Sequence, residues 1–203
     1  MITPRRALGA GFLSLHRLGG RAHGKAFSLL AAGAFAGFGA DSMLQPPIRL
    51  AGEARIRIGR GVFVGAGSWL QVLDGCEADV ALSVGDGTSM AGGCVISAAR
   101  SISLGKHVLV ARNVYIADHQ HSFEDATRPV LAQGVSGVAA VEIGDGAWLG
   151  ENVVVGPGVR IGRGSVVGAN AVVLASVPDY SVAVGAPARV VRSFAPVQPG
   201  VPA

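Results

Sequence analysis

A large aliphatic residue returns at every sixth position between residues 143 and 173. The series is Ile143, Leu149, Val155, Ile161, Val167 and Val173, and glycine follows each of the first five. A period of six is neither the 3.6-residue period of a helix nor simple strand alternation. It fits short strands separated by regular turns, which is the repeat of a parallel β-helix. We therefore expect an all-β solenoid in which three short strands make a triangular coil and point aliphatic side chains into a common core.

The same rhythm begins near Leu50 and is interrupted at three places. It slips over residues 68–82, gains two residues between Ile96 and Leu104, and is lost altogether over residues 117–140. Long loops in a regular scaffold usually carry function. The sequence therefore predicts a β-helix over residues 50–192 with an extruded loop at 117–140, an N-terminal helical cap or arm over 1–49, and a flexible tail over 193–203.

Composition excludes several other classes of protein. The chain of 203 residues contains 31 glycines but only 15% charged residues, as expected for a turn-rich aliphatic solenoid. The net charge of +4 suggests nucleic acid, but no nucleic-acid motif or dense basic stripe lies within the repeats, so we expect no nucleic-acid partner. Cys76 and Cys94 show no metal-ligand spacing and no disulfide framework, which favours the reducing cytoplasm.

Residues 1–40 are basic, with no acidic residue before Asp41. Their two apolar stretches are too short to span a bilayer, and a secretory signal fits poorly because charged residues interrupt the first stretch. Two interpretations remain. The favoured one is a helical cap or subunit-contact arm over the first coil, because solenoids need capped ends. The other is a basic amphipathic helix in peripheral contact with an anionic membrane, at its inner face.

The long interruption opens with two histidines, in the order Asp118, His119, Gln120, His121. Histidine exchanges a proton near neutral pH, and at the mouth of a cleft it can deprotonate a hydroxyl that attacks a carbonyl. A histidine in an arbitrary loop is more often a solvated or structural residue. The position where the solenoid is interrupted favours a catalytic histidine here.

Four segments carry a resemblance to a known family: residues 93–98 (GCVISA), 113–130 (NVYIADHQHSFEDATRPV), 141–173 and 177–191. With them the chain resembles the hexapeptide-repeat acyltransferases, and within these the maltose and galactoside O-acetyltransferase-like branch that includes polysaccharide O-acetyltransferases. The resemblance implies a left-handed parallel β-helix and a homotrimer. It also implies that acetyl-CoA lies in a groove between neighbouring β-helices, with no metal required.

The resemblance also implies roles for individual residues. His119 occupies the place of the catalytic general base, which takes the proton from a saccharide hydroxyl of a surface polysaccharide or glycolipid precursor as that hydroxyl attacks the thioester directly. His121 matches a second histidine that orients or contacts the substrate, and Asp118 is placed either to hold the imidazole tautomer or to contact the substrate. The residues implied for acetyl-CoA are Trp148, Gly150, Gly168, Ala169 and Arg189.

Two alternative functions remain open on the sequence alone. A metal-dependent enzyme like the γ-class carbonic anhydrases would need three converging histidines, and His107, His119 and His121 lack the usual spacing. A non-catalytic scaffold would keep the solenoid without the chemistry. The intact histidine loop argues against a scaffold, and coenzyme A binding without turnover would support one.

Overall fold

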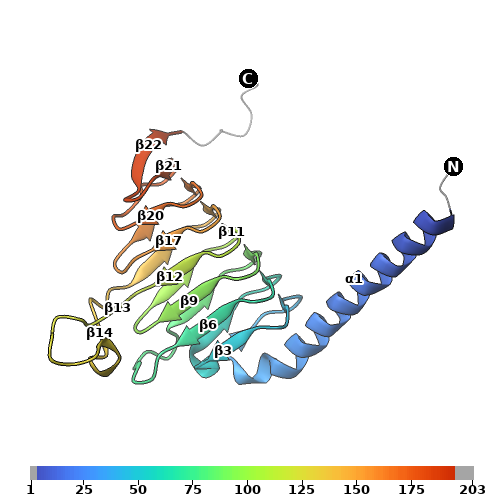
Figure 1. The fold of residues 1–203 in the computed structure, drawn as a ribbon, viewed down its shortest axis with the longest axis horizontal. Coiled ribbons are helices and arrows are strands. Elements are labelled where there is room, and N and C mark those ends of the chain that lie inside the picture. Colours follow the sequence, from blue (N-terminus) through green and yellow to red (C-terminus); the bar gives the residue numbers. More distant parts are fainter. Residues whose placement is uncertain (1–3, 195–203) are drawn as a thin grey trace.

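Three sheets, parallel except for the antiparallel last strand of one of them, form the faces of a triangular prism in the computed structural model, which describes residues 4–194 (Figure 1). The first face contains β1 (Gly37–Phe38), β4 (Ile56–Ile58), β7 (Leu82–Val84), β10 (Ile102–Leu104), β15 (Val141–Ile143) and β18 (Arg160–Ile161). The second face contains β2 (Met43–Leu44), β5 (Phe63–Val64), β8 (Ser89–Met90), β11 (Leu109–Val110), β16 (Trp148–Leu149), β19 (Val166–Val167), β21 (Ser181–Val184) and β22 (Arg189–Ser193). The third face contains β3 (Arg49–Ala51), β6 (Trp69–Val72), β9 (Val95–Ala98), β12 (Tyr115–Ala117), β17 (Val154–Val155) and β20 (Val172–Val173).

The strand register confirms the prediction of three strands per coil. Ile143 lies beside Ile161 on the first face, and Leu149 lies beside Val167 on the second. Each aliphatic residue of the repeat is therefore stacked on the one three repeats later, and these side chains are at most 2% exposed. They form a continuous column, since every coil buries its aliphatic residues against the coils above and below.

Glycine follows the aliphatic residue because the corners of successive coils stack closely. A Cβ atom on Gly150 would lie 2.6 Å from the backbone nitrogen of Ala169 in the next coil. Only glycine lets the two backbones approach to this distance. The Ile/Val-Gly pattern is thus explained by close packing of backbones at the corners.

The coil begins earlier than the Leu50 boundary expected from the sequence. Strands β1, β2 and β3 pair in parallel with β4, β5 and β6, so that the first coil starts at Gly37. Phe38, Leu44 and Leu50 keep the spacing of six, but Leu44 and Leu50 lack the following glycine, which hid this coil. At the other end Ser193 belongs to β22, whereas residues 195–203 of the predicted flexible tail lie outside the described residues.

The loss of period after β12 coincides with a segment that leaves the three faces. It carries the antiparallel pair β13 (Gln120–His121) and β14 (Val135–Ser136), together with the 3-10 turn η3 (Val130–Ala132). Figure 1 shows this segment projecting from the prism. Its ends are joined, because the backbone N–H of Ala139 donates to the Asp118 carbonyl over 2.8 Å. The parallel ladder therefore continues directly from β10 to β15.

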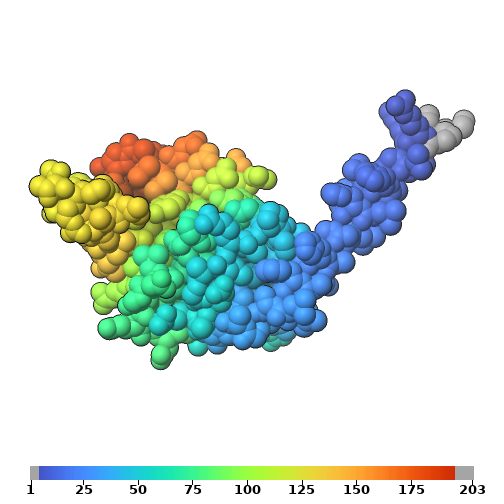
Figure 2. All heavy atoms as spheres, turned by 60° about the horizontal axis from the view of Figure 1, so that its bottom comes forward, coloured from blue at the N-terminus to red at the C-terminus, as the bar shows by residue number. Residues whose placement is uncertain are grey.

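The N-terminal segment forms a single helix, α1 (Pro4–Ala31), of 28 residues. Its C-terminal part, from Gly20 onward, packs on the first coil: the Gly20 carbonyl accepts a hydrogen bond from Gln45 Nε2 over 3.2 Å, and a Cβ on the buried Gly24 would lie 2.8 Å from Gln45 Oε1. Ser28 Oγ accepts the N–H of Leu44 over 2.8 Å, so the helix caps one open backbone group of the first coil. The rest of α1 projects away from the prism (Figures 1 and 2). Among the residues described, none lies in a helix with both the length and the apolar character to cross a membrane.

Candidate active site

A buried carboxylate stands at the point where the chain leaves the prism. Asp118 follows β12 directly and its side chain is 0% exposed. Its Oδ1 accepts the backbone N–H of Ala99, and its Oδ2 accepts those of Arg100 and Ser101, each over 2.7 Å. These donors lie at the same corner of the preceding coil, where the two extra residues between Ile96 and Leu104 widen the turn. The widened turn thus forms a cradle for one carboxylate.

The cradle keeps Asp118 ionised. Burial raises the pKa of this carboxyl, but hydrogen bonds from Ala99, His119, Arg100 and Ser101 together stabilise the charged form more. The pKa of Asp118 therefore lies below its ordinary value. A negative charge is fixed inside the wall of the prism.

His119 is oriented by this charge. Its Nδ1 lies 2.9 Å from Asp118 Oδ1, and its side chain is only 7% exposed. Because a carboxylate accepts hydrogen bonds, this contact assigns a proton to Nδ1 and leaves Nε2 as the unprotonated nitrogen of the neutral ring. The pair has the geometry of a general base held by an orienting carboxylate.

Ser97 and Gln71 complete the hydrogen-bonded chain around His119. Ser97 Oγ lies 3.5 Å from His119 Nε2, and Gln71 Nε2 donates to Ser97 Oγ over 2.6 Å. Both residues belong to the third face, on β9 and β6, directly before the dyad along that face. The sequence analysis missed them. The signal was the position of Ser97 and Gln71, which are polar residues directly after Ile96 and Leu70, where the repeat mostly carries glycine or alanine.

A cleft adjoins the carboxylate cradle. Its volume is ≈ 510 Å³, and it lies between the backbone turn at Ala99 and Arg100 and the excursion where the rhythm slips, at residues 75–78. Arg100 thus serves two purposes, since its N–H holds Asp118 while the residue lines the cleft. The interruption at residues 68–82 and the one between Ile96 and Leu104 therefore meet at this cleft, beside the start of the long interruption at residues 117–140.

The structure separates the remaining predicted residues from the dyad. His121 is exposed on β13, and Trp148 is 48% exposed on the second face. Gly150, Gly168 and Ala169 lie at the corner between the second and third faces, whereas His119 lies at the corner that follows the third. Arg189 is exposed on β22 at the end of the second face. Within one chain, therefore, Asp118 is the only residue of the predicted set that is hydrogen-bonded to His119, and the predicted cofactor residues lie at other corners.

The histidines do not converge within the chain. His107 occupies the turn between the first and second faces with a φ of 55°, and so sits at a different corner from His119. Over residues 4–194, no group of three or more histidine, cysteine, aspartate or glutamate side chains is placed to hold a metal ion.

Fold and site together describe a hexapeptide-repeat solenoid with a histidine–aspartate dyad at its longest interruption. Residues 140–175 match the family model for bacterial transferase hexapeptide (six repeats). The resemblance to the hexapeptide-repeat acyltransferase family is therefore confirmed.

Two curated relatives of the chain are named as acetyltransferases. Over 140 residues the chain is 37% identical to a Mycobacterium tuberculosis protein named as an acetyltransferase, Rv3034c, with 69% of this chain and 45% of that protein covered. Over 105 residues it is 38% identical to Escherichia coli K12 WbbJ, named as an O-acetyl transferase of lipopolysaccharide biosynthesis, with 49% and 54% covered. The chain thus spans about half the length of the curated relatives it matches.

A solved structure extends the likeness over most of the chain. The hexapeptide-repeat acetyltransferase VCA0836 of Vibrio cholerae, in complex with acetyl coenzyme A, is 29% identical with a TM-score of 0.55. The match covers 83% of this chain and 76% of that one.

Proposed function

We propose that this protein is an O-acetyltransferase that moves an acetyl group from acetyl-CoA to a saccharide hydroxyl. The observation that carries the proposal is the buried dyad of Asp118 and His119 at the interruption of the solenoid. Its support from the comparisons is that relatives named as acetyltransferases match over the repeats. The acceptor class follows the relative named for lipopolysaccharide biosynthesis.

His119 is the general base in this mechanism. Its Nε2 takes the proton of the acceptor hydroxyl as the oxygen attacks the thioester carbonyl, and later returns that proton to the departing thiol. Asp118 holds the imidazole through Nδ1 and stabilises the positive charge that the ring carries between the two transfers. The acetyl group passes directly from sulfur to oxygen, so that no acyl-enzyme forms. His121, on the exposed hairpin, contacts the acceptor.

Acetyl-CoA is assigned to the second face and its corner. The exposed ring of Trp148 lies beside exposed Leu109 on the neighbouring strand, which suits the apolar arm of the cofactor. Arg189, exposed at the end of the same face, suits its phosphates. Gly150, Gly168 and Ala169 would let the thiol arm approach the backbone. The residues present therefore fit the group.

We further propose a homotrimer of left-handed β-helices with the cofactor between neighbours. The support is the separation just described, since one chain holds the base and the predicted cofactor residues at different corners. A second chain packed beside the first would supply the missing side of the site. Both cysteines are free and buried, which supports a cytoplasmic location.

The test is release of coenzyme A thiol from acetyl-CoA over a panel of sugars and glycolipid precursors. We expect His119→Ala to lower turnover by roughly 10²–10⁴. The matched control is His121→Ala, which removes an exposed histidine from the same loop and should raise KM more than it lowers kcat. Unchanged turnover in His119→Ala with any acceptor that the wild type acetylates would reject the assigned base.

A further inference from the structure

The exposed part of α1 carries an apolar stripe that no residue of the described range 4–194 covers. We define the apolar stripe as Leu8, Phe12, Leu15, Leu18, Ala22, Ala26 and Leu29. Steps of three and four residues place all of them on one side of the helix. The four large residues that lie beyond the coil, from Leu8 to Leu18, are each between 62% and 78% exposed. At about 1.5 Å per residue the helix is about 42 Å long.

The apolar stripe lies on the side of α1 opposite to the side that packs on the prism. The packing side consists of Gly20, Gly24, Phe27, Ser28 and Ala31, which are buried or half-buried. Successive residues turn by about 100° around the helix, so that these two sets point in opposite directions. Capping the first coil therefore leaves the apolar stripe free.

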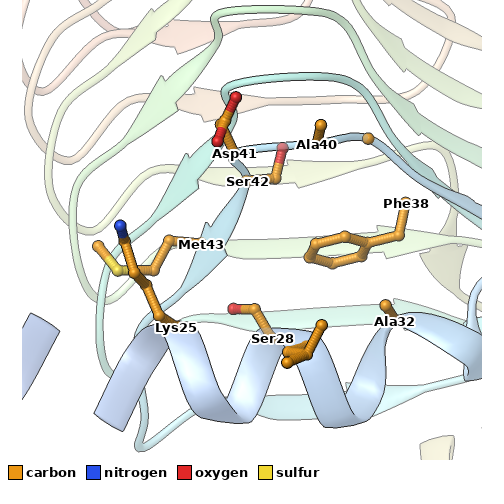
Figure 3. A pocket seen from close by; sticks show the side chains of 10 residues that line it. Lys25, Ser28, Ala32, Phe38, Ala40, Asp41, Ser42 and Met43 are labelled. Carbon is orange, nitrogen blue, oxygen red and sulfur yellow. The ribbon is translucent and has the colours of Figure 1, made fainter. Parts of the chain in front are cut away.

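The apolar stripe reaches a cleft at the base of the helix. This cleft has a volume of ≈ 430 Å³ and lies between α1 and the first coil, with Leu29 on its wall. Figure 3 shows Phe38 and Ala32 on one side and Met43 beside Lys25 on the other (Figure 3). The apolar surface thus continues from the exposed helix to the body of the protein.

Charge selects the partner for this surface. The helix contains Arg5, Arg6, Arg17, Arg21 and Lys25, and no acidic residue. Packing against the same helix of a second copy would set like charges side by side, with no carboxylate on either helix to pair with them. An anionic lipid surface offers an apolar layer for the stripe and negative headgroups for the two cations at its edges, Arg5 and Lys25. Arg6, Arg17 and Arg21 turn toward the opposite side of the helix.

We propose that α1 lies in the interface of an anionic membrane, with the apolar stripe turned into the lipid and the prism held outside. This anchor is separate from the proposed transferase chemistry. Arg5 and Lys25 border the two edges of the stripe around the helix, where long cationic side chains reach the headgroups while their stems stay in apolar surroundings.

The test is sedimentation of the full chain with vesicles of phosphatidylcholine alone or mixed with phosphatidylglycerol. We expect binding to the anionic vesicles and at least about tenfold weaker binding to the neutral ones, since each cation near the surface contributes about fivefold. Raising the ionic strength from about 0.1 M to about 1 M shortens the Debye length from about 10 Å to about 3 Å and should release the protein. Equal binding to both vesicles, or none, would overturn the proposal.

A matched pair of variants tests the face of the helix. Leu15→Gln changes the apolar stripe and should weaken vesicle binding about tenfold, whereas Leu13→Gln changes an exposed leucine on the other side and should alter it less than about twofold. Both residues are exposed, and glutamine keeps the helix. Equal losses in the two variants would refute the assigned face. If Leu15→Gln changed the oligomeric state and left vesicle binding unaltered, the stripe would cover a second copy instead.

Discussion

Replacing Asp118 by asparagine should destabilise the protein at neutral pH. The difference in stability between this variant and the wild type should become smaller in acid. The side chain accepts three backbone N–H groups and the N–H of His119, two on each oxygen. Asparagine has one amide oxygen and one amide nitrogen. Whichever way the amide is turned, its NH2 group replaces an oxygen that accepted two N–H groups, and it cannot accept from either of them. Each hydrogen bond to a charged acceptor contributes about 1.5–3 kcal/mol. We expect the free energy of unfolding to fall by about 3–5 kcal/mol.

The pH dependence identifies the charge as the cause. The pKa of Asp118 is lowered in the folded protein, so its contribution to stability is fully present above the unfolded value of about 3.9 and is lost as the pH falls through the folded pKa. The stability difference between wild type and Asp118→Asn should therefore be largest near about pH 7 and shrink below about pH 4.

Urea unfolding followed by circular dichroism at fixed protein concentration measures this difference. The matched control is Asp145→Asn, because Asp145 also accepts a backbone N–H, that of Lys106 over 2.7 Å, but at an exposed corner. The free energy of unfolding of Asp145→Asn should fall by no more than about 1 kcal/mol, since an exposed amide oxygen can keep the hydrogen bond from Lys106. A loss in Asp118→Asn that is as small as in the control, or that is the same in acid as at neutral pH, would refute the role of the cradle.

Four further outcomes follow from the packing and the dyad. Leu149→Ala should lower the free energy of unfolding by about 2–5 kcal/mol in urea titrations, because the side chain is 0% exposed; a loss below 1 kcal/mol would contradict a close-packed column. Gly9→Ala should raise the helical circular dichroism signal and stabilise α1 by up to about 1 kcal/mol, since nothing lies within 4 Å of its added Cβ. Ser97→Ala should change acetyl transfer by less than about tenfold, whereas His119→Ala lowers it by roughly 10²–10⁴, as kcat measurements would show; an equal loss would make Ser97 a catalytic residue. Burial raises the pKa of the Cys94 thiol, so a disulfide reagent should leave it unmodified in the native protein at neutral pH and react with it in urea.

The sequence was sufficient to predict the fold wherever the period was intact. From Ile143 to Val167 one rule, an aliphatic residue followed by glycine, fixes both the inward side chain and the corner. The first coil was missed because Leu44 is followed by Gln45 and because its open side is closed by Ser28 of a distant helix. Such a cap depends on packing between elements, which a local period does not record.

The site was predictable only in part, for a related reason. His119 and Asp118 stand next to each other in the chain, so sequence alone could pair them. Ser97 and Gln71 reach the dyad because they are stacked one and two coils away on the same face. Their contact depends on the register of the coils, and this register absorbs a variable number of extra residues at 73–80 and at 99–101.

The closure of the loop at its base has a consequence for how specificity can diverge in such a scaffold. The bond from Ala139 to Asp118 and the uninterrupted ladder from β10 to β15 make the projecting segment an insert at a fixed anchor point. A different insert of another length could be joined after His119 and before Ala139 without shifting the coils on either side. Recombination at these two points would exchange the surface proposed to meet the acceptor while Asp118 and His119 stay in place.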